Sequence, residues 1–373
     1  MKPVEEYIVP WVREAESYSD KHMDFAWDHP DILRMMSNEN LLTPPQSVLD
    51  AVMAAAKTGN LYPGSGKRVR ELLGKRAGLT AENVILGNGS TDVINFIIHT
   101  FVAPGDDVVI SVPTFPMYVT RTRINGGNPI LVPMTPDFYW DIDAMLIAVT
   151  PKTKLIFICS PNNPTGNMIK DEDLKRILDL GVPTFLDEAY FELETEPKSR
   201  IYLLKDYPNL IINRTMSKAY GIAGMRVGYA LADEKIIAYF NRSRIPWNVS
   251  LIALAAAEAV LLDEEDQKRK RKNIIEGRTF LIEQLDEIPG IKSYPSEGNF
   301  VLFDASCLGK TSLEIRDDII AKGIFIRPME GHQTKPGFMR VTVGTPEMNE
   351  RFIKVFRQYV EDVMATKKMD NQF

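Results

Sequence analysis

Short runs of β-branched and other apolar residues recur through the middle of the chain, separated by longer stretches of helical periodicity. The runs are apolar almost without interruption, which is typical of strands in a sheet covered on both faces, and they lie at 83–87, 107–112, 128–133, 154–160, 183–189 and 209–215. The helical stretches lie at 91–102, 141–149 and 171–180. This alternation predicts an α/β domain with a mostly parallel central sheet.

The rhythm changes after residue 250. A long helical stretch is followed by three apolar runs and a closing helix, at 250–287, 299–303, 324–328, 338–343 and 346–365. This pattern predicts a smaller α+β domain. A chain of 373 residues also exceeds the roughly 250–300 residues at which single cores stop growing. We therefore expect an arm at 1–45 that packs on the small domain, a large domain at 46–270 and a small C-terminal domain at 271–373.

Charge and composition exclude several classes of partner. The net charge of −6 and the pI near 5.5 argue against nucleic acid and anionic membranes. The basic run KRKRK at 268–272 is flanked by acidic residues, so we interpret it as a solvated helix face. The two cysteines, Cys159 and Cys307, exclude a disulfide framework and a cysteine-rich metal site. No apolar run approaches the ~18 residues that span a bilayer, and the acidic, proline-broken N-terminus is unlike a signal peptide. We expect a soluble, cytoplasmic protein without a metal.

Polar or glycine-rich segments follow several predicted strands, and ligands of such sheets bind beyond the carboxyl ends of the strands. GNGSTD (87–92) opens a helix and would present backbone N–H groups to an anion such as phosphate, although an ordinary cap has the same pattern. Phe115 could stack on a flat ring or belong to the core, and Asn163 in SPNNPTG could donate a hydrogen bond or close a turn. Asp187 ends an apolar strand in FLDEAY, where an isolated buried carboxylate is costly, so it should cap a group or face a cation. Tyr190 can approach the same space.

The segment RTMSKAYGIAGMRVG (214–228) places Lys218 in a nearly uncharged, flexible stretch, with Arg226 eight positions later (226 − 218). Burial and nearby positive charge both lower the pKa of a lysine, which produces the neutral amine that forms an imine with an aldehyde. A guanidinium matches the geometry of a phosphate, and Ser217 could bind the same group. The segment therefore predicts a cradle for pyridoxal 5′-phosphate (PLP), with Lys218 as the Schiff-base lysine and Arg226 on the phosphate.

These motifs resemble a known family. SKAYGIAGMRVGY, SPNNPTG, FLDEAY and MRVTVGTPEMNE are similar to motifs of the class I and II aminotransferases, which have PLP-dependent fold type I. The likeness is strongest to the histidinol-phosphate aminotransferase branch, and it runs from MSNEN (36–40) onward. It implies a large PLP-binding domain, a smaller α+β domain and a homodimer.

The resemblance also implies roles for individual residues. Asp187 would pair with the pyridine nitrogen, Tyr190 and Asn163 would bond the phenolic oxygen, and Phe115 would stack on the ring where relatives usually have tyrosine. The remaining cofactor-binding residues, most of them at the phosphate, would be Gly89, Ser90, Thr91, Thr215, Ser217, Arg226 and, from the neighbouring subunit, Tyr62. Lys218, Asp187 and Tyr190 would be the catalytic residues.

On the substrate side, Arg340 would bind an α-carboxylate, with Asn163 beside it. Arg327 would bind a phosphate carried by the substrate, unless it is an exposed arginine at a strand end. Three places leave the substrate open. Residues 20–35 match no family pattern, GSTD replaces the usual aspartate–glutamate pair, and His332 lies between the two arginines.

The sequence thus predicts a PLP-dependent aminotransferase acting on an amino acid or amino phosphate, either histidinol phosphate-like or aromatic, and a 2-oxo acid such as 2-oxoglutarate. Lys218 would move the α-proton as general acid and base. The alternative is a decarboxylase, eliminase or cyclase of the same fold that acts on a phosphorylated or polar amino acid. A PLP-sensing transcription regulator would need a DNA-binding module, for which we expect no room before residue 36.

Overall fold

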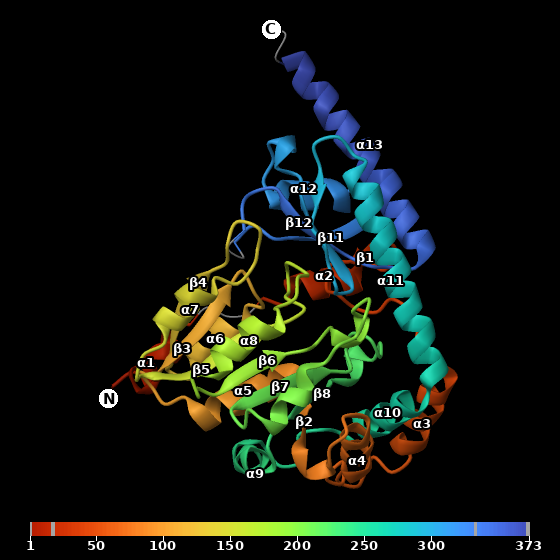
Figure 1. Cartoon of the computed structure of the whole chain (residues 1–373). Helices are drawn as coiled ribbons and strands as arrows, with labels where there is room; N and C mark the ends of the chain where they lie inside the picture. Colours follow the sequence, from red (N-terminus) through yellow and green to blue (C-terminus); the bar gives the residue numbers. More distant parts are fainter. Residues whose placement is uncertain (1, 16–18, 332–333, 371–373) are drawn as a thin grey trace.

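The computed structural model describes residues 2–15, 19–331 and 334–370. Its large domain is built on a seven-stranded sheet with the order β2-β8-β7-β6-β5-β3-β4 (Figure 1). The strands are β2 (Val84–Asn88), β3 (Asp107–Val112), β4 (Asn128–Pro133), β5 (Thr153–Cys159), β6 (Thr184–Asp187), β7 (Leu210–Thr215) and β8 (Val227–Leu231). Strand β8 is antiparallel to both of its neighbours, and all other pairs are parallel. The prediction of a mostly parallel sheet is confirmed.

Successive residues of the central strands enter two different cores. Val108 packs on one face of the sheet with α5 (Ser90–Phe101), α6 (Met117–Ile124) and α9 (Glu234–Ser243). Val109 packs on the opposite face with α7 (Ile142–Ala148) and α8 (Asp171–Leu178). Each fully buried aliphatic side chain contributes about 1.5–3 kcal/mol. The apolar runs are therefore continuous because both faces of the sheet are covered.

A second sheet forms the small domain, with the order β1-β11-β12-β10-β9. Its strands are β1 (Leu33–Met35), β9 (Lys292–Ser293), β10 (Phe300–Asp304), β11 (Ile324–Pro328) and β12 (Phe338–Thr342). The three predicted strands of this domain are present, and its core includes side chains of α11 (Glu264–Asp286), α12 (Ser312–Ile320) and α13 (Pro346–Asp370). The other helices are α1 (Pro10–Arg13), α2 (Lys21–Asp28), α3 (Gln46–Ala56), α4 (Lys67–Arg76), α10 (Leu251–Leu262) and the short 3₁₀ segments Val4–Tyr7, Ala81–Asn83, Phe191–Leu193, Arg200–Lys205, Ala223–Met225 and Ser306–Leu308.

The first residues of the chain touch both domains. β1 extends the small sheet by pairing with β11, whereas α1 lies against α6 of the large domain. The expectation that the whole arm packs on the small domain is therefore wrong for α1. The boundaries at residues 45 and 270 stay predictions, and the second of them falls inside α11, which runs from one domain to the other (Figure 1).

Two further expectations need correction. The stretch at 214–228 is not flexible up to its end, because Gly228 lies within β8. The start of α5 packs directly on this residue, where a Cβ would lie 2.3 Å from the Ser90 nitrogen, so only glycine fits. The basic run at 268–272 is not a solvated face throughout, since Lys270 is fully buried. Among the described residues, no helix is both long and apolar enough to cross a membrane.

Candidate active site

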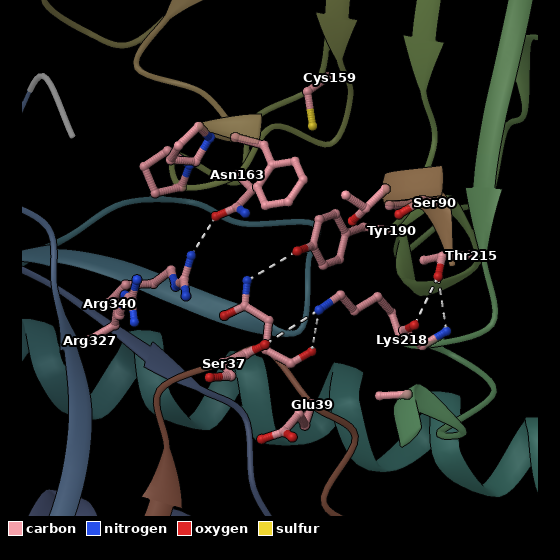
Figure 2. A pocket seen from close by; sticks show the side chains of 18 of the residues that line it. Ser37, Glu39, Ser90, Cys159, Asn163, Tyr190, Thr215, Lys218, Arg327 and Arg340 are labelled. Atoms are coloured by element: carbon pink, nitrogen blue, oxygen red, sulfur yellow. Dashed lines mark hydrogen bonds between the residues drawn. The ribbon is translucent and has the colours of Figure 1, made fainter. Parts of the chain in front are cut away.

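A cavity of about 480 Å³ lies between the two domains, at the carboxyl ends of strands β5, β6 and β7. Side chains from both domains point into it (Figure 2). The sequence-predicted residues that line the cavity are Ser90, Thr91, Phe115, Asn163, Asp187, Tyr190, Thr215, Ser217, Lys218, Arg226, Arg327 and Arg340. Residues from distant parts of the chain thus converge on one site, where the topology of an α/β sheet places ligands.

Lys218 follows β7, and its ammonium group is held by backbone carbonyls of the N-terminal segment. The Nζ atom donates to the Asn38 oxygen at 2.9 Å and to the Ser37 oxygen at 3.4 Å (Figure 2). Burial, followed by the positive charge of Arg340, lowers the pKa of Lys218 to about 8. A substantial fraction of this amine is therefore neutral and nucleophilic near physiological pH.

Asp187 ends β6 and is buried beneath the cavity. Its carboxylate accepts hydrogen bonds from the Tyr118 hydroxyl at 2.6 Å, the Asn213 amide at 2.9 Å and the Ala189 backbone nitrogen at 3.0 Å. Burial nevertheless raises the pKa of Asp187, because desolvation outweighs these donors. A cationic group in the cavity would stabilise this carboxylate.

The start of α5 and the Arg226 side chain form a cradle that fits an anion. Ser90 and Thr91 are the first residues of α5, where backbone N–H groups are free to bind. Gly89 has a φ of +77°, and a Cβ at this position would lie 2.4 Å from the Arg226 guanidinium. Gly89 does not itself line the cavity, but its lack of a side chain leaves room for Arg226. The backbone nitrogen of Ser217 donates to Thr215 Oγ1 at 3.1 Å beside this cradle.

Two arginines enter the cavity from the small domain. Arg327 on β11 and Arg340 on β12 are direct partners across the antiparallel strand pair. Arg340 donates to the Met36 backbone oxygen at 2.9 Å and to the Asn163 carboxamide oxygen, and it lies 5.5 Å from the Phe300 ring centroid. The two arginines that the resemblance assigned to the substrate therefore line the same cavity.

Two aromatic side chains complete the walls of the cavity. The Tyr190 hydroxyl accepts a hydrogen bond from the Asn38 amide at 3.1 Å, and burial raises the pKa of Tyr190, so this hydroxyl stays protonated. Phe115 lies edge-on to Tyr118, with ring centroids 5.6 Å apart. Tyr190 therefore keeps a proton that it can donate to a ligand oxygen.

Two predicted residues need separate mention. Tyr62 does not line the cavity of its own chain: it is 81% exposed and stacks on Trp247 with ring centroids 4.9 Å apart. His332 lies outside the described residues.

Sequence reasoning missed several residues of the site, among them Asn38, Tyr118 and His22. Asn38 contacts both Lys218 and Tyr190, Tyr118 bonds Asp187, and His22 of α2 lines the cavity with Arg327. The only available signals were the motif MSNEN around Asn38 and the unmatched histidines of residues 20–35. Neither signal shows which side chains these residues contact in the folded protein.

Comparison with known proteins identifies the family. The model for aminotransferase class I and II matches residues 30–356. The chain belongs to this family. The histidinol-phosphate aminotransferase of Moorella thermoacetica is 38% identical over 337 residues, which are 88% of this chain and 85% of the relative. That of Methanosarcina mazei is 34% identical over 357 residues, covering 95% and 94% of the two chains. The crystal structure of histidinol-phosphate aminotransferase from Sinorhizobium meliloti, in complex with pyridoxal-5′-phosphate, has a TM-score of 0.84 at 26% identity and covers 95% of this chain and 98% of that one.

The protein is therefore a PLP-dependent aminotransferase of fold type I, and it falls in the histidinol-phosphate aminotransferase branch. The cavity fits this cofactor on its own chemistry. It offers a lysine of lowered pKa for an aldehyde, a buried carboxylate for a cationic ring nitrogen, and a helix N-terminus with an arginine for a phosphate. The phosphate cradle is the feature most specific for the cofactor, because Arg226 occupies a space beside Gly89 that a side chain at residue 89 would fill.

Proposed function

We propose that this aminotransferase moves an amino group between histidinol phosphate, or a similar amino phosphate, and a 2-oxo acid such as 2-oxoglutarate. The observation that carries the proposal is the pairing of Arg327 with Arg340 in the cavity of Lys218. Two neighbouring guanidinium groups match 2-oxoglutarate, which carries a carboxylate at each end. A donor that has a distal phosphate and no carboxylate can use Arg327 for that phosphate. The names of the relatives support the same substrate.

Bound PLP supplies an electrophilic aldehyde and a ring that accepts the electrons of a bond broken at the substrate Cα. Within this scheme, Lys218 would anchor the cofactor, then remove the α-proton from the substrate and deliver it to the C4′ carbon of the cofactor, for which a pKa of about 8 is well suited. Asp187 would keep the proton on the ring nitrogen. Tyr190 and Asn163 would bond the phenolic oxygen, and Phe115 would stack on the ring. Ser90, Thr91, Ser217 and Arg226, which line the cavity, would hold the phosphate, and Gly89 and Thr215 would shape its cradle.

The reaction type is tested by supplying an amino donor without an acceptor. An aminotransferase leaves its cofactor in the amino form, pyridoxamine phosphate, in an amount equal to the active sites. A decarboxylase, eliminase or cyclase releases its product and regenerates the aldehyde form. Stoichiometric pyridoxamine phosphate, measured by absorbance and chromatography, is the result that we expect. Catalytic release of carbon dioxide or ammonia would instead establish the alternative reaction.

The substrate is tested with Arg327→Ala and Arg340→Ala. Removing Arg340 should lower kcat/KM for every carboxylate substrate. The loss should correspond to about 2–5 kcal/mol of transition-state stabilisation, the usual effect of losing one partner of a desolvated charge pair. Removing Arg327 should depress kcat/KM far more for histidinol phosphate than for phenylalanine. Arg316→Ala, whose guanidinium pairs with Asp317 and does not line the cavity, is the matched control. Equal losses on both donors would show that Arg327 is structural.

We further propose that the protein is a cytoplasmic homodimer. Leu61, Tyr62, Ile245 and Trp247 are exposed, and the rings of Tyr62 and Trp247 stack on each other. Exposed apolar patches on soluble proteins commonly mark interfaces. A second subunit that covers this cluster would bring Tyr62 to a neighbouring cofactor phosphate. The two cysteines form no disulfide, which is compatible with a reducing compartment.

A further inference from the structure

The buried part of the basic run on α11 reaches the loop that carries Lys218. Lys270 is 0% exposed, and its Nζ atom donates to the Tyr220 backbone oxygen at 2.8 Å. The same ammonium forms an ion pair with Asp266 at 2.6 Å, one helical turn earlier. Tyr220 lies two residues after Lys218. A charge on α11 therefore acts on the backbone of the catalytic loop.

This loop is held from two sides. Gly221 has a φ of +68°, and a Cβ added there would lie 3.1 Å from Lys270 Nζ and 3.4 Å from Asn40 Cβ. The Asn40 amide donates to the Ala219 oxygen at 3.3 Å. The residues after Lys218 are thus confined between α11 and the N-terminal segment that also accepts the Lys218 ammonium.

Neighbouring side chains of α11 bind loops that follow other site residues. Arg271 donates to the backbone oxygens of Glu192, at 3.1 Å, and Glu194, at 2.7 Å, just after Tyr190. Asn273 donates to the Gly344 oxygen at 3.1 Å, shortly after Arg340. One helix therefore fixes the backbone beside three residues that meet in the cavity.

We propose that Lys270 is a positioning residue for catalysis, holding the Tyr220 carbonyl so that Lys218 keeps its place and its surroundings in the cavity. The inference rests on the proposed role of Lys218 but not on the identity of the substrate. Burying an ammonium costs several kcal/mol before its partners compensate. Asp266 and the Tyr220 carbonyl are those partners, so removing the ammonium also leaves a buried carbonyl without its donor.

Lys270→Met tests the proposal, because it keeps most of the length of the side chain but removes its charge and its donors. In the cofactor-loaded enzyme, kcat should fall by between about 10- and 100-fold, the range expected when a reacting group is misplaced by about 1 Å. KM for the 2-oxo acid should change little, because Arg340 is untouched. Lys272→Met is the matched control, since that side chain lies on the same helix and is 73% exposed.

A second readout follows Lys218 in the full-length protein without cofactor. The pH midpoint of Lys218 modification by an amine-reactive reagent, measured by peptide mass spectrometry, should lie near 8 in the unaltered protein. It should move toward the ordinary lysine pKa of about 10.4 in Lys270→Met, because a loosened loop admits water. An unchanged kcat and an unchanged midpoint would overturn the proposal, even if the unfolding temperature fell.

A variant that retains a donor separates positioning from folding. Lys270→Gln can still donate to the Tyr220 carbonyl but cannot pair as a cation with Asp266. It should recover most of the lost kcat, and it supplies both readouts if Lys270→Met does not fold. A Gln variant as slow as the Met variant would overturn the role of the Tyr220 contact. Failure of the Lys218 assignment itself would be recognised separately, as a cofactor bound covalently to another lysine of the unaltered protein.

Discussion

Burial is the largest cause of the lowered pKa of Lys218, and the positive charges of Arg340 and Arg226 lower it further. The negative charges of Glu39 and Asp187 raise it. The net effect is a pKa of about 8 in the folded protein, against about 10.4 for an ordinary lysine. Between these values the unfolded chain binds more protons at this site than the folded chain does. This group therefore makes the cofactor-free protein more stable as the pH rises from about 8 to about 10.4.

The same shift predicts the pH dependence of cofactor loading. The rate of covalent PLP incorporation, followed by absorbance, should rise with pH and level off above about 8. Arg340→Ala should move this midpoint upward, because it removes the largest cause after burial. Borohydride reduction of the loaded protein and peptide mapping should place the label on Lys218. A label on another lysine would contradict the assignment.

His22 is expected to help choose the substrate. It lines the cavity with Arg327, and burial, followed by the charges of Arg327 and, more weakly, Arg34, lowers its pKa, while Asp20 opposes the shift. The neutral imidazole is therefore favoured at pH 7 when no anion is bound beside it. A phosphate bound at Arg327 would bring negative charge close to it and favour protonation.

His22→Phe should accordingly reduce kcat/KM for histidinol phosphate by about three- to tenfold, the usual size of one hydrogen bond, and leave phenylalanine almost unaffected. The loss should grow as the pH falls from 8 to 6, where the protonated imidazole is most populated. His29→Phe is the control, since His29 stacks on Phe25 and does not line the cavity. A uniform loss on both donors would assign His22 to folding alone.

For individual residues, the sequence allowed a prediction where the residue belongs to a local motif. Lys218, Asp187 and Asn163 could be predicted because Asp187 ends β6, while Lys218 and Asn163 lie within four residues of the ends of β7 and β5, where the ligands of such sheets bind. Asn38 and Tyr118 could not, because their partners Tyr190 and Asp187 lie 152 and 69 positions away. Such contacts depend on how the two domains fold together, which residue spacing does not report.

Among the secondary-structure elements, α5 shows how a helix start depends on a missing side chain. Gly89→Ala should lower PLP affinity by about tenfold or more, because the methyl group would displace Arg226 from a charge-assisted contact worth about 1.5–3 kcal/mol. Gly78→Ala is the matched control: Gly78 has a similar φ of +67° but no atom within 4 Å of the added Cβ. Both variants place an alanine at a positive φ, but only Gly89→Ala should change the dissociation constant measured by fluorescence titration. Equal affinities would remove Gly89 from the cradle.

Helices and strands were predictable to different degrees. The buried strands of the large sheet were recognised because both of their faces are covered and their sequences are almost wholly apolar. β8 was missed because Gly228, in its second position, looked like part of the preceding loop. The charges of α11 were misread as a solvated face, since a buried ammonium becomes acceptable only when Asp266 and a backbone carbonyl lie beside it.

For the whole molecule, the cavity formed by one chain leaves Tyr62 on the outside, exposed and stacked on Trp247. If Tyr62 serves the phosphate of a second subunit, the active protein must be a dimer. Sedimentation at assay concentration should therefore show a dimer. Tyr62→Ala should lose activity by about 10- to 100-fold, as expected for a hydrogen bond to a charged phosphate.

Mixed dimers decide whether Tyr62 acts on its own chain or on the neighbouring one. Lys218→Ala and Tyr62→Ala should each be nearly inactive alone. When equal amounts are dissociated and reassociated together, half of the dimers contain one chain of each kind, and each of these has one complete site if Tyr62 acts across the interface. Activity should then recover to about a quarter of that of the unaltered enzyme, because a closed two-fold dimer has two equivalent sites. If Tyr62 acts on its own chain, no site in the mixture is complete and no activity returns. An active monomer in sedimentation would exclude the arrangement across the interface.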